Sequence, residues 1–423
     1  MWLQRDLSLF GRVLLSKADG ISRFVYPTLS LFVQQSLCKE INNTLINFVW
    51  KNKCHHLKKE ILAGPRGEGG MELLDYVDMN YTFKTKWIKE YLKKPESLWY
   101  FIPHNIFGKI GGLPFLLSCD YNVSKLPLKL SKFHQQALSA AKLCFVHNFS
   151  PHKTIIWNNE FITRKNKSLY LKHWIDRKII YLEDLQNEEG KILSYEEFLR
   201  SKLFPVTYKE FQMVVNAIPN GILQLLKGHF NRQETEEVDL TLFINGINIM
   251  SHHCNNKHIR NHFYRKRKIT PRGKFVWSSS FTDINWKTTW LLPHKFAICN
   301  KIKEVQYNIL HNIYPTNTFL SRFSNTDVKC AFCHVEEETT MHLFFECQFS
   351  QVFWKKMENY ITLQSNLLIN LKAKDVLLYY NEKKIQHLTN LIILIAKFHI
   401  LNSPKAAPSS LCLKLNLRTT LSI

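Results

Sequence analysis

The chain has 423 residues, of which 57 are Lys or Arg and 34 are Asp or Glu, so its formal net charge is +23. This length allows several modules with a sizeable core. Arg5 and Asp6 interrupt the N-terminus before an apolar signal develops, and the apolar run at residues 391–396 is too short to span a bilayer. We therefore predict a chain of the nucleus or cytoplasm with no membrane partner.

The excess of positive charge indicates attraction to polyanions. Nucleic acid is the first candidate partner and an anionic membrane surface is the second. The third interpretation is a basic, solvated surface with no particular partner. Only clustering of the charge along the chain separates these interpretations.

Apolar side chains recur at helical spacing in two stretches near the N-terminus. The first stretch contains Leu3, Leu7, Phe10 and Leu14. The second contains Leu37, Ile41, Leu45 and Phe48. We expect Gly20 to end the first helix and Pro27 to form a turn before the second.

Three further segments have a predicted local structure. Two of them precede the basic region and one follows it. The glycine-rich stretch at residues 64–70 predicts a sharp turn, because no Gly-Lys-Ser/Thr follows that would make it a phosphate cradle. Residues 80–94 predict a helix with Phe83, Trp87 and Tyr91 four residues apart. Another helix is expected where Ile298, Ile302, Val305 and Ile309 recur.

Residues 257–274 contain eight Lys or Arg residues and no acid, with aromatic residues between them. Cations neutralise phosphates and aromatic rings stack on unpaired bases, so the segment predicts contact with RNA. The alternatives are a solvated surface loop or a nuclear-import signal. The candidate nucleic-acid-binding residues are Lys257, Arg260, Phe263, Tyr264, Arg265, Lys266, Arg267, Lys268, Arg272 and Lys274.

A Cys-x2-Cys-x8-His-x4-Cys pattern is formed by Cys330, Cys333, His342 and Cys347. Three thiolates and one imidazole are the ligands of a closed, tetrahedral, structural zinc site. Such a site has no open coordination position, so it favours a folding or binding module over metal catalysis. The alternative is a set of ordinary cysteines beside a buried histidine. A second cluster, from His252 to His262, lacks ligands at a familiar spacing, and we expect it to be polar surface.

No catalytic residues are predicted. Transfer of nucleotides with two metal ions needs carboxylates packed together, and the sequence has no adjacent Asp-Asp pair. It also has no Walker lysine motif, no His-Glu-x-x-His and no Gly-x-Ser-x-Gly. We therefore expect a chain that is not an enzyme.

Several segments, in their order, resemble the C-terminal portion of non-LTR (long interspersed element) reverse transcriptases. Residues 2–17 and 21–27 resemble the segment downstream of the palm, which forms the helical thumb in that family. Residues 69–75 are similar to its Gly-Gly-Leu-Gly-Leu-Pro-Asp/Asn turn, without one glycine and the proline. Residues 309–316, the Cys/His pattern and Phe353-Trp354 resemble its Cys-rich end. The resemblance covers the chain to about residue 402.

The resemblance implies thumb-like and Cys-rich RNA-binding parts, while the endonuclease, fingers and palm are missing. We predict a mostly α-helical, multi-module chain with a small zinc-knuckle-like C-terminal segment. The expected domains are a thumb-like segment at 1–60, a helical connector at 61–240, a nucleic-acid-binding segment at 241–402 and a disordered tail at 403–423.

The predicted function is noncatalytic binding of RNA or an RNA–DNA hybrid, with structural zinc as cofactor. One alternative is a subunit that supports RNA-directed DNA synthesis in trans with a palm-bearing reverse transcriptase chain. The other is a decayed, element-derived polypeptide without function.

Overall fold

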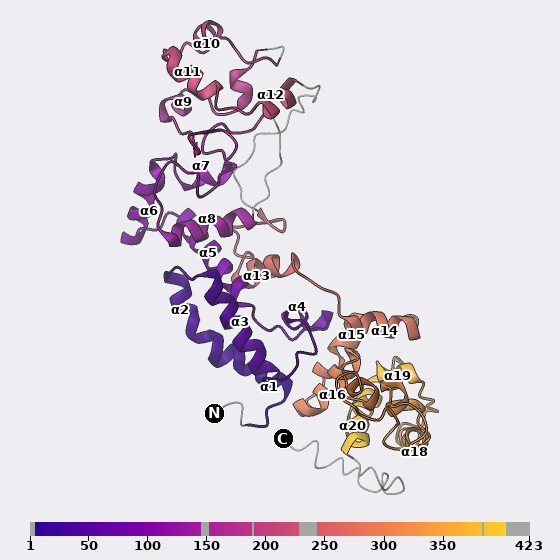
Figure 1. Cartoon of the computed structure of the whole chain (residues 1–423). Helices are drawn as coiled ribbons and strands as arrows, with labels where there is room; N and C mark the ends of the chain where they lie inside the picture. The colour runs from indigo at the N-terminus through magenta and orange to yellow at the C-terminus, as the bar shows by residue number, and fades with distance from the viewer. Residues whose placement is uncertain (1–4, 145–151, 188–189, 228–242, 383–384, 403–423) are drawn as a thin grey trace. The chain divides into compact units, whose positions relative to one another are not determined.

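The computed structural model describes residues 5–144, 152–187, 190–227, 243–382 and 385–402 (Figure 1). The predicted class is confirmed, because helices dominate these residues and the two sheets have two strands each. β1 (Thr163–Arg164) pairs antiparallel with β2 (Lys167–Ser168), and β3 (Phe243–Ile244) pairs antiparallel with β4 (Ile247–Asn248). Within these ranges, none of the helices combines the length and hydropathy that a bilayer crossing requires.

The chain divides into two compact units. The terminal unit comprises Met1–Phe24, Lys39–Asp75 and Arg267–Ile423, and the central unit comprises Val25–Cys38 and Tyr76–Lys266. Each unit combines segments that are distant in the sequence, so neither unit is one continuous range of residues. The predicted domain boundaries at residues 60, 240 and 402 stay predictions, and the tail at 403–423 lies outside the described residues.

The central unit is built around α5. Its helices are α5 (Tyr76–Leu92), α6 (Leu98–Gly108), α7 (Leu113–Ser118), α8 (Lys132–Cys144), α9 (Lys172–Asp176), η4 (Leu182–Leu185), α10 (Tyr195–Lys202), α11 (Tyr208–Val215), α12 (Asn220–Lys227) and α13 (Asn256–Arg265). The helix predicted at residues 80–94 is confirmed, with Phe83 and Tyr91 buried. α5 contacts both α8 and α13, and a second apolar core lies within residues 156–226.

Lys84 of α5 is a cation inside the central unit. Its ammonium donates to the carbonyl oxygens of Thr28 and Leu31, at 2.6 and 2.7 Å, and lies 4.5 Å from the ring centroid of Phe133. Burial lowers the pKa of Lys84 to about 8. The carbonyl groups at the end of α2 (Ser22–Ser30) are thereby satisfied without water.

The N-terminal helices differ from the prediction in their ends and in their buried faces. Gly20 does not end a helix: α1 (Leu9–Leu15) continues through the π-helical η2 (Ser16–Ile21) into α2, and Pro27 lies inside α2 instead of in a turn. Leu14 is exposed, whereas Val13 and the aliphatic part of Arg12 are buried. Apolar spacing located α3 (Gln35–Val49), but its buried face is rotated toward Cys38 and Asn42, and Leu37 is exposed.

The terminal unit contains the remaining helices. They are α4 (Lys59–Leu62), η3 (Arg66–Glu68), α14 (Arg272–Ser280), α15 (Trp286–Leu291), η5 (Leu292–His294), α16 (Asn300–Leu310), α17 (Asn317–Leu320), η6 (His342–Glu346), α18 (Gln348–Ser365), α19 (Ala373–Leu377) and α20 (Gln386–Asn402). The helix predicted around residues 298–309 is confirmed as α16, with Ile302 and Ile309 buried.

The glycine-rich turn joins the early and late segments of the terminal unit. The Gly69 carbonyl oxygen accepts hydrogen bonds from Tyr307 Oη at 3.0 Å and from His311 Nε2 at 2.8 Å. A side chain on Gly70 would place its Cβ 1.9 Å from the Gly64 carbonyl oxygen, so only glycine fits there. The predicted sharp turn is confirmed, and its backbone docks on α16.

Three helices of the terminal unit meet at a buried lysine. Lys397 of α20 donates to the side-chain oxygen of Gln306 in α16, and at 2.7 Å to the carbonyl oxygen of Val376 in α19. Gln306 Nε2 in turn donates to the Leu377 carbonyl oxygen at 3.0 Å. Burial lowers the pKa of Lys397 to about 7, because no water solvates the ammonium.

This lowered pKa predicts a dependence of stability on pH. Between pH 7 and about 10.5 the unfolded chain binds the Lys397 proton more strongly than the folded chain does, so stability should rise with pH in this window. Lys397→Met should flatten that rise in denaturant midpoints measured from pH 7 to 10. Lys356→Met, at an exposed position of α18, should leave the rise unchanged. The same slope in all three proteins would contradict a neutral Lys397.

Candidate functional site

The structure brings the four predicted metal ligands together. One ligand atom from each of Cys330, Cys333, His342 and Cys347 lies within 4.8 Å of the others. The Sγ atoms of Cys330 and Cys347 are 4.0 Å apart, and Cys333 Sγ is 3.4 Å from His342 Nε2. Ligands at ordinary Zn–S and Zn–N lengths in a tetrahedron are about 3.5–3.8 Å apart. The donor set and its spacing therefore fit zinc.

A short backbone ladder holds the first two ligands. Lys329 and Glu337 form an antiparallel bridge, and the Cys330 amide donates to the Glu336 carbonyl oxygen at 2.8 Å. Inside this loop the His334 amide donates to the Cys330 carbonyl oxygen at 2.9 Å. The loop thereby turns tightly between Cys330 and Cys333, so that both thiols face one point.

A π-helical turn positions the other two ligands. His342 begins η6, and the Cys347 amide donates to the His342 carbonyl oxygen at 2.8 Å. An α-helix has 3.6 residues per turn, so residues five apart point in different directions. The wider i→i+5 turn brings His342 and Cys347 to the same side. The x4 gap in the sequence thus corresponds to a π turn, which is rare and often found at functional sites.

Burial and hydrogen bonding shift the pKa values of the three thiols in different directions. Cys330 and Cys347 are fully buried, and burial raises the pKa of both thiols, that of Cys330 to about 12. Burial also opposes ionisation of Cys333, but hydrogen bonds from the backbone of Glu336 and Val335 outweigh it and lower the pKa of Cys333 to about 6. A bound divalent cation deprotonates its thiol ligands outright.

Glu338 supports the metal-ligand loop, although it is not one of the ligands. Its buried carboxylate accepts hydrogen bonds from the amides of Ala331 at 2.7 Å and Asn317 at 2.9 Å. The carboxylate thus ties the turn between Cys330 and Cys333 to the start of α17. The sequence carried no signal for this role, because Glu338 ends a run of three glutamates that resembles solvated surface.

Aromatic residues anchor the second half of the site in the core. Phe344 of η6 is fully buried, and its carbonyl oxygen accepts a hydrogen bond from Trp354 Nε1 at 2.7 Å. The Leu343 carbonyl oxygen accepts one from Ser350 Oγ, also at 2.7 Å. Because a π turn leaves carbonyl groups without ordinary helical partners, side chains of α18 satisfy them.

The predicted nucleic-acid-binding segment passes from one unit to the other between Lys266 and Arg267, so its two parts are described separately. In the central unit, Lys257, Arg265 and Lys266 are exposed on and beside α13, while Arg260 and Tyr264 are half-buried. The Lys266 ammonium donates to the Leu143 carbonyl oxygen near the end of α8.

Phe263 is corrected from a stacking residue to a core residue. Its ring is 4% exposed and lies 5.5 Å from the Tyr81 ring in the core beside α5. Ile259 lies one helical turn earlier on the same buried face of α13. The apolar spacing of α13 therefore determines where Phe263 points, and its ring is not available to a base.

In the terminal unit, two of the predicted cations pair with acids. Arg267 Nη1 lies 3.4 Å from Asp75 Oδ2, and Lys268 Nζ lies 2.9 Å from Glu68 Oε2. Arg272 and Lys274 are exposed in the first turn of α14. The sequence run is therefore not a uniform set of available cations.

The second histidine cluster makes hydrogen bonds within the protein. His262 contacts the Asn245 side chain at 2.9 Å through Nδ1, and His258 contacts the Ile244 carbonyl oxygen at 3.1 Å through Nε2. Both bonds attach α13 to the β3–β4 hairpin. Among the described residues, no other group of three or more His, Cys, Asp or Glu comes together as the four ligands do. His262 is buried and His258 is half-buried, so these two side chains do not form the polar surface that the sequence predicted.

Comparison with known proteins bears on the C-terminal region. Residues 274–354 match the family model described as zinc-binding in reverse transcriptase. The match begins in α14, contains all four ligands and ends at Trp354. A Xenopus laevis protein named "Transposon TX1 uncharacterized 149 kDa protein" is 19% identical over an alignment of 389 residues, and the alignment covers 81% of this chain. The predicted resemblance is confirmed.

Residues 274–354 thus carry a zinc-binding segment associated with reverse transcriptases. The similarity to the transposon protein extends well beyond that segment, into the chain's earlier parts. The chain spans 29% of the length of that relative. The four ligands thus lie in a segment that matches a model of zinc binding in reverse transcriptase, within a chain that is similar over most of its length to a transposon protein.

The role of Glu338 predicts a loss of stability on its replacement. Glu338→Ala should lower the free energy of unfolding by about 3 kcal/mol, because it leaves two backbone amides near the metal-ligand loop without acceptors. Glu336→Ala, at an exposed side chain of the same loop, should change it by less than about 0.5 kcal/mol. Chemical denaturation of both variants measures this difference, and equal losses would contradict the assigned role.

Proposed function

We propose that this chain is a noncatalytic, RNA-binding portion of a retrotransposon reverse transcriptase, stabilised by structural zinc. The observation that carries the proposal is the convergence of three thiols and one imidazole within 4.8 Å, inside a segment that matches the zinc-binding part of reverse transcriptases. The proposed location is the nucleus or the cytoplasm.

The four-ligand site supports a binding role over a catalytic one. A zinc ion held by Cys330, Cys333, His342 and Cys347 has all four tetrahedral positions filled by protein. No position is left for water or substrate, so the ion would stabilise the fold around the η6–α18 junction. The proposed zinc contributes folding free energy instead of chemistry.

The charge of the chain supports a polyanionic partner. At a net charge of +23, long-range attraction to phosphate is strong and sensitive to salt. The best candidates for phosphate contacts are the exposed cations of the predicted segment that have neither an ion pair nor a hydrogen bond through the side chain with another described residue. They are Lys257 and Arg265 in the central unit and Arg272 and Lys274 in the terminal unit.

The proposed partners are RNA or an RNA–DNA hybrid, together with a palm-bearing reverse transcriptase chain or segment. The length of the transposon relative supports the second partner, because this chain covers less than a third of it. In this proposal the polymerase chemistry belongs to that partner, and the residues described above hold nucleic acid.

Zinc content tests the metal site. Purified wild-type protein should contain about one zinc per chain, and Cys330→Ser and Cys347→Ser should each lose most of it. Cys299→Ser, at an exposed cysteine outside the cluster, should retain the metal. Elemental analysis together with thermal denaturation before and after chelation measures both content and stabilisation. Equal zinc in all variants would refute the site.

Binding of single-stranded RNA tests the proposed function. Affinity should fall steeply between 50 and 200 mM salt, as counterion release requires. Arg265→Glu should weaken binding severalfold and reduce the slope of log affinity against log salt. Lys209→Glu makes a comparable change of charge at an exposed site of α11 and is the matched control. Wild-type affinity that is independent of salt, or equal loss in both variants, would contradict the assignment.

A further inference from the structure

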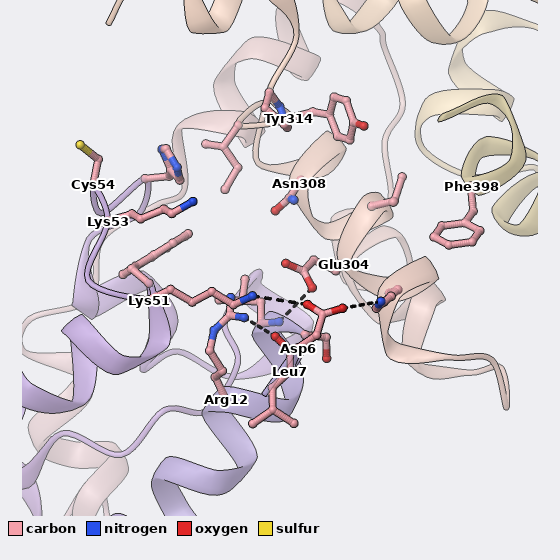
Figure 2. Close-up of a pocket in the computed structure, with 18 residues that line it drawn as sticks. Asp6, Leu7, Arg12, Lys51, Lys53, Cys54, Glu304, Asn308, Tyr314 and Phe398 are labelled. Atoms are coloured by element: carbon pink, nitrogen blue, oxygen red, sulfur yellow. Dashed lines mark hydrogen bonds and ion pairs between the residues drawn. The ribbon is translucent and has the colours of Figure 1, made fainter. Parts of the chain in front are cut away.

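A pocket of about 460 Å³ lies in the terminal unit, apart from the Cys/His cluster (Figure 2). Its walls are the segment that enters α1, the turn after α3, and α16 with the loop that follows it. Its volume falls within the range of about 300–1,000 Å³ that is typical of pockets for small ligands. None of the residues predicted to bind zinc or nucleic acid lines it.

Cationic side chains from two walls reach this pocket. Lys51 and Lys53 come from the turn after α3, and Lys301 comes from the first turn of α16. The Asp6 carboxylate joins the two walls, with Oδ2 2.7 Å from Lys301 Nζ and Oδ1 3.5 Å from Lys51 Nζ. Its side chain is 73% exposed, so an external anion can compete with it. Two lysines are thus already arranged around one anionic group.

Lys53 adds a third cation that the protein itself does not neutralise. Among the described residues its ammonium has no hydrogen-bond or ion-pair partner. In Figure 2 its side chain extends from the turn toward the middle of the pocket, and Asn308 faces it from α16. An unpaired cation beside an exposed lysine–carboxylate bridge favours a further anion.

The turn that presents these lysines has an unfavourable backbone conformation. Lys51 and Asn52 both have positive φ angles, 54° and 56°. Asparagine tolerates this region after the end of a helix, but lysine does so at a cost. The conformation is held by hydrogen bonds from the Asn52 amide to Asn47 and from the Lys53 amide to Trp50. Such strained residues cluster at ligand sites.

Hydrogen bonds hold the inner part of the pocket, where the charges of Arg12 and Glu304 offset each other. Arg12 is 7% exposed and donates through Nε to the Val49 carbonyl oxygen at 2.5 Å. Glu304 accepts a hydrogen bond from the Leu9 amide at 2.9 Å, so its carboxylate is occupied at the start of α1. These bonds fix the walls before a ligand arrives, which lowers the cost of binding.

The part of the pocket beyond Lys301 suits a heterocycle. Asn308 offers an amide that makes no side-chain hydrogen bond with another described residue, and Tyr314 and Phe398 add aromatic surface. An amide beside aromatic rings can pair with the edge of a base and cover its face. The base contacts therefore begin on α16 about two helical turns beyond Lys301, next to the phosphate contacts.

We propose that this pocket holds one nucleotide of a single-stranded nucleic acid, with its phosphate among Lys51, Lys53 and Lys301 and its base against Asn308 and Tyr314. The phosphate takes over the bridging position of the Asp6 carboxylate. The inference rests on the proposed function, since it adds a defined nucleotide site to an RNA-binding chain.

Calorimetric titration of the full chain with adenosine 5′-monophosphate tests the site. Lys53→Ala should weaken binding at least fivefold, whereas Lys58→Ala, an exposed lysine just beyond the pocket, should have no effect. Asp6→Asn should strengthen binding severalfold, because it removes the competing carboxylate. A merely structural role of Asp6 would give the opposite sign. Unchanged affinity in Lys53→Ala would overturn the proposal.

Further probes separate the phosphate from the base. Inorganic phosphate should bind more weakly than the nucleotide and show the same sensitivity to Lys53→Ala, and adenosine should bind more weakly still. Adenosine that binds as well as the nucleotide would refute the phosphate site. Phosphate that binds as well as the nucleotide would refute the base wall.

Binding of a single-stranded RNA oligonucleotide separates this proposal from the proposed function. Lys51→Ala/Lys53→Ala should reduce the slope of log affinity against log salt by about 0.7, the value for one phosphate contact on a single strand. If Arg265→Glu weakens RNA binding and the double variant does not, the pocket proposal fails alone. If the chain binds no RNA but binds the nucleotide through Lys53, the proposed function fails alone.

Discussion

The hydrogen bonds accepted by the Gly69 carbonyl oxygen are the constraint on which the terminal unit depends. Tyr307 and His311 both donate to it from buried positions. Burial lowers the pKa of His311 to about 3, so the ring is neutral and Nε2 carries the hydrogen that it donates. Its Nδ1 is left without a hydrogen-bond partner. The unsatisfied Nδ1 is the cost of fixing the turn at Gly69 against α16. In turn, α16 forms one wall of the pocket and precedes the segment that contains the metal ligands.

Two different backbone structures, a tight loop and a π turn, form the metal centre. A tight loop closed by the Lys329–Glu337 bridge presents two sulfurs, and a π turn presents an imidazole and a third sulfur. Neither device depends on the other's hydrogen bonds. The Glu338 carboxylate and the core contacts of Phe344 hold each in place. Packing therefore preorganises the positions of the four ligands, and a metal ion can complete the site.

Sequence reasoning located the ligands and most helices, and it failed where packing decided orientation. Apolar spacing found α3, α5 and α16, because each buries apolar side chains at helical spacing. It misjudged α1, where a long cationic side chain, Arg12, is buried and donates a hydrogen bond to the distant Val49 carbonyl oxygen. It counted Phe263 as surface because the neighbouring residues are basic, although one face of α13 belongs to the core. The pocket had no sequence signature, since its walls come from segments some 250 residues apart.

The discontinuous terminal unit has a consequence for the order in which the chain folds. The apolar residues Leu9, Val13 and Ile46 share their core with Tyr307, which leaves the ribosome nearly 300 residues after the first of them. The central unit lies almost entirely between them in the sequence and contains its own cores. Domains generally fold as units during synthesis, so the central unit can form while the N-terminal helices still lack their partner. The contacts that the N-terminal helices make with Tyr307 form late and are non-local. They must offset the entropy that is lost when so long a loop closes.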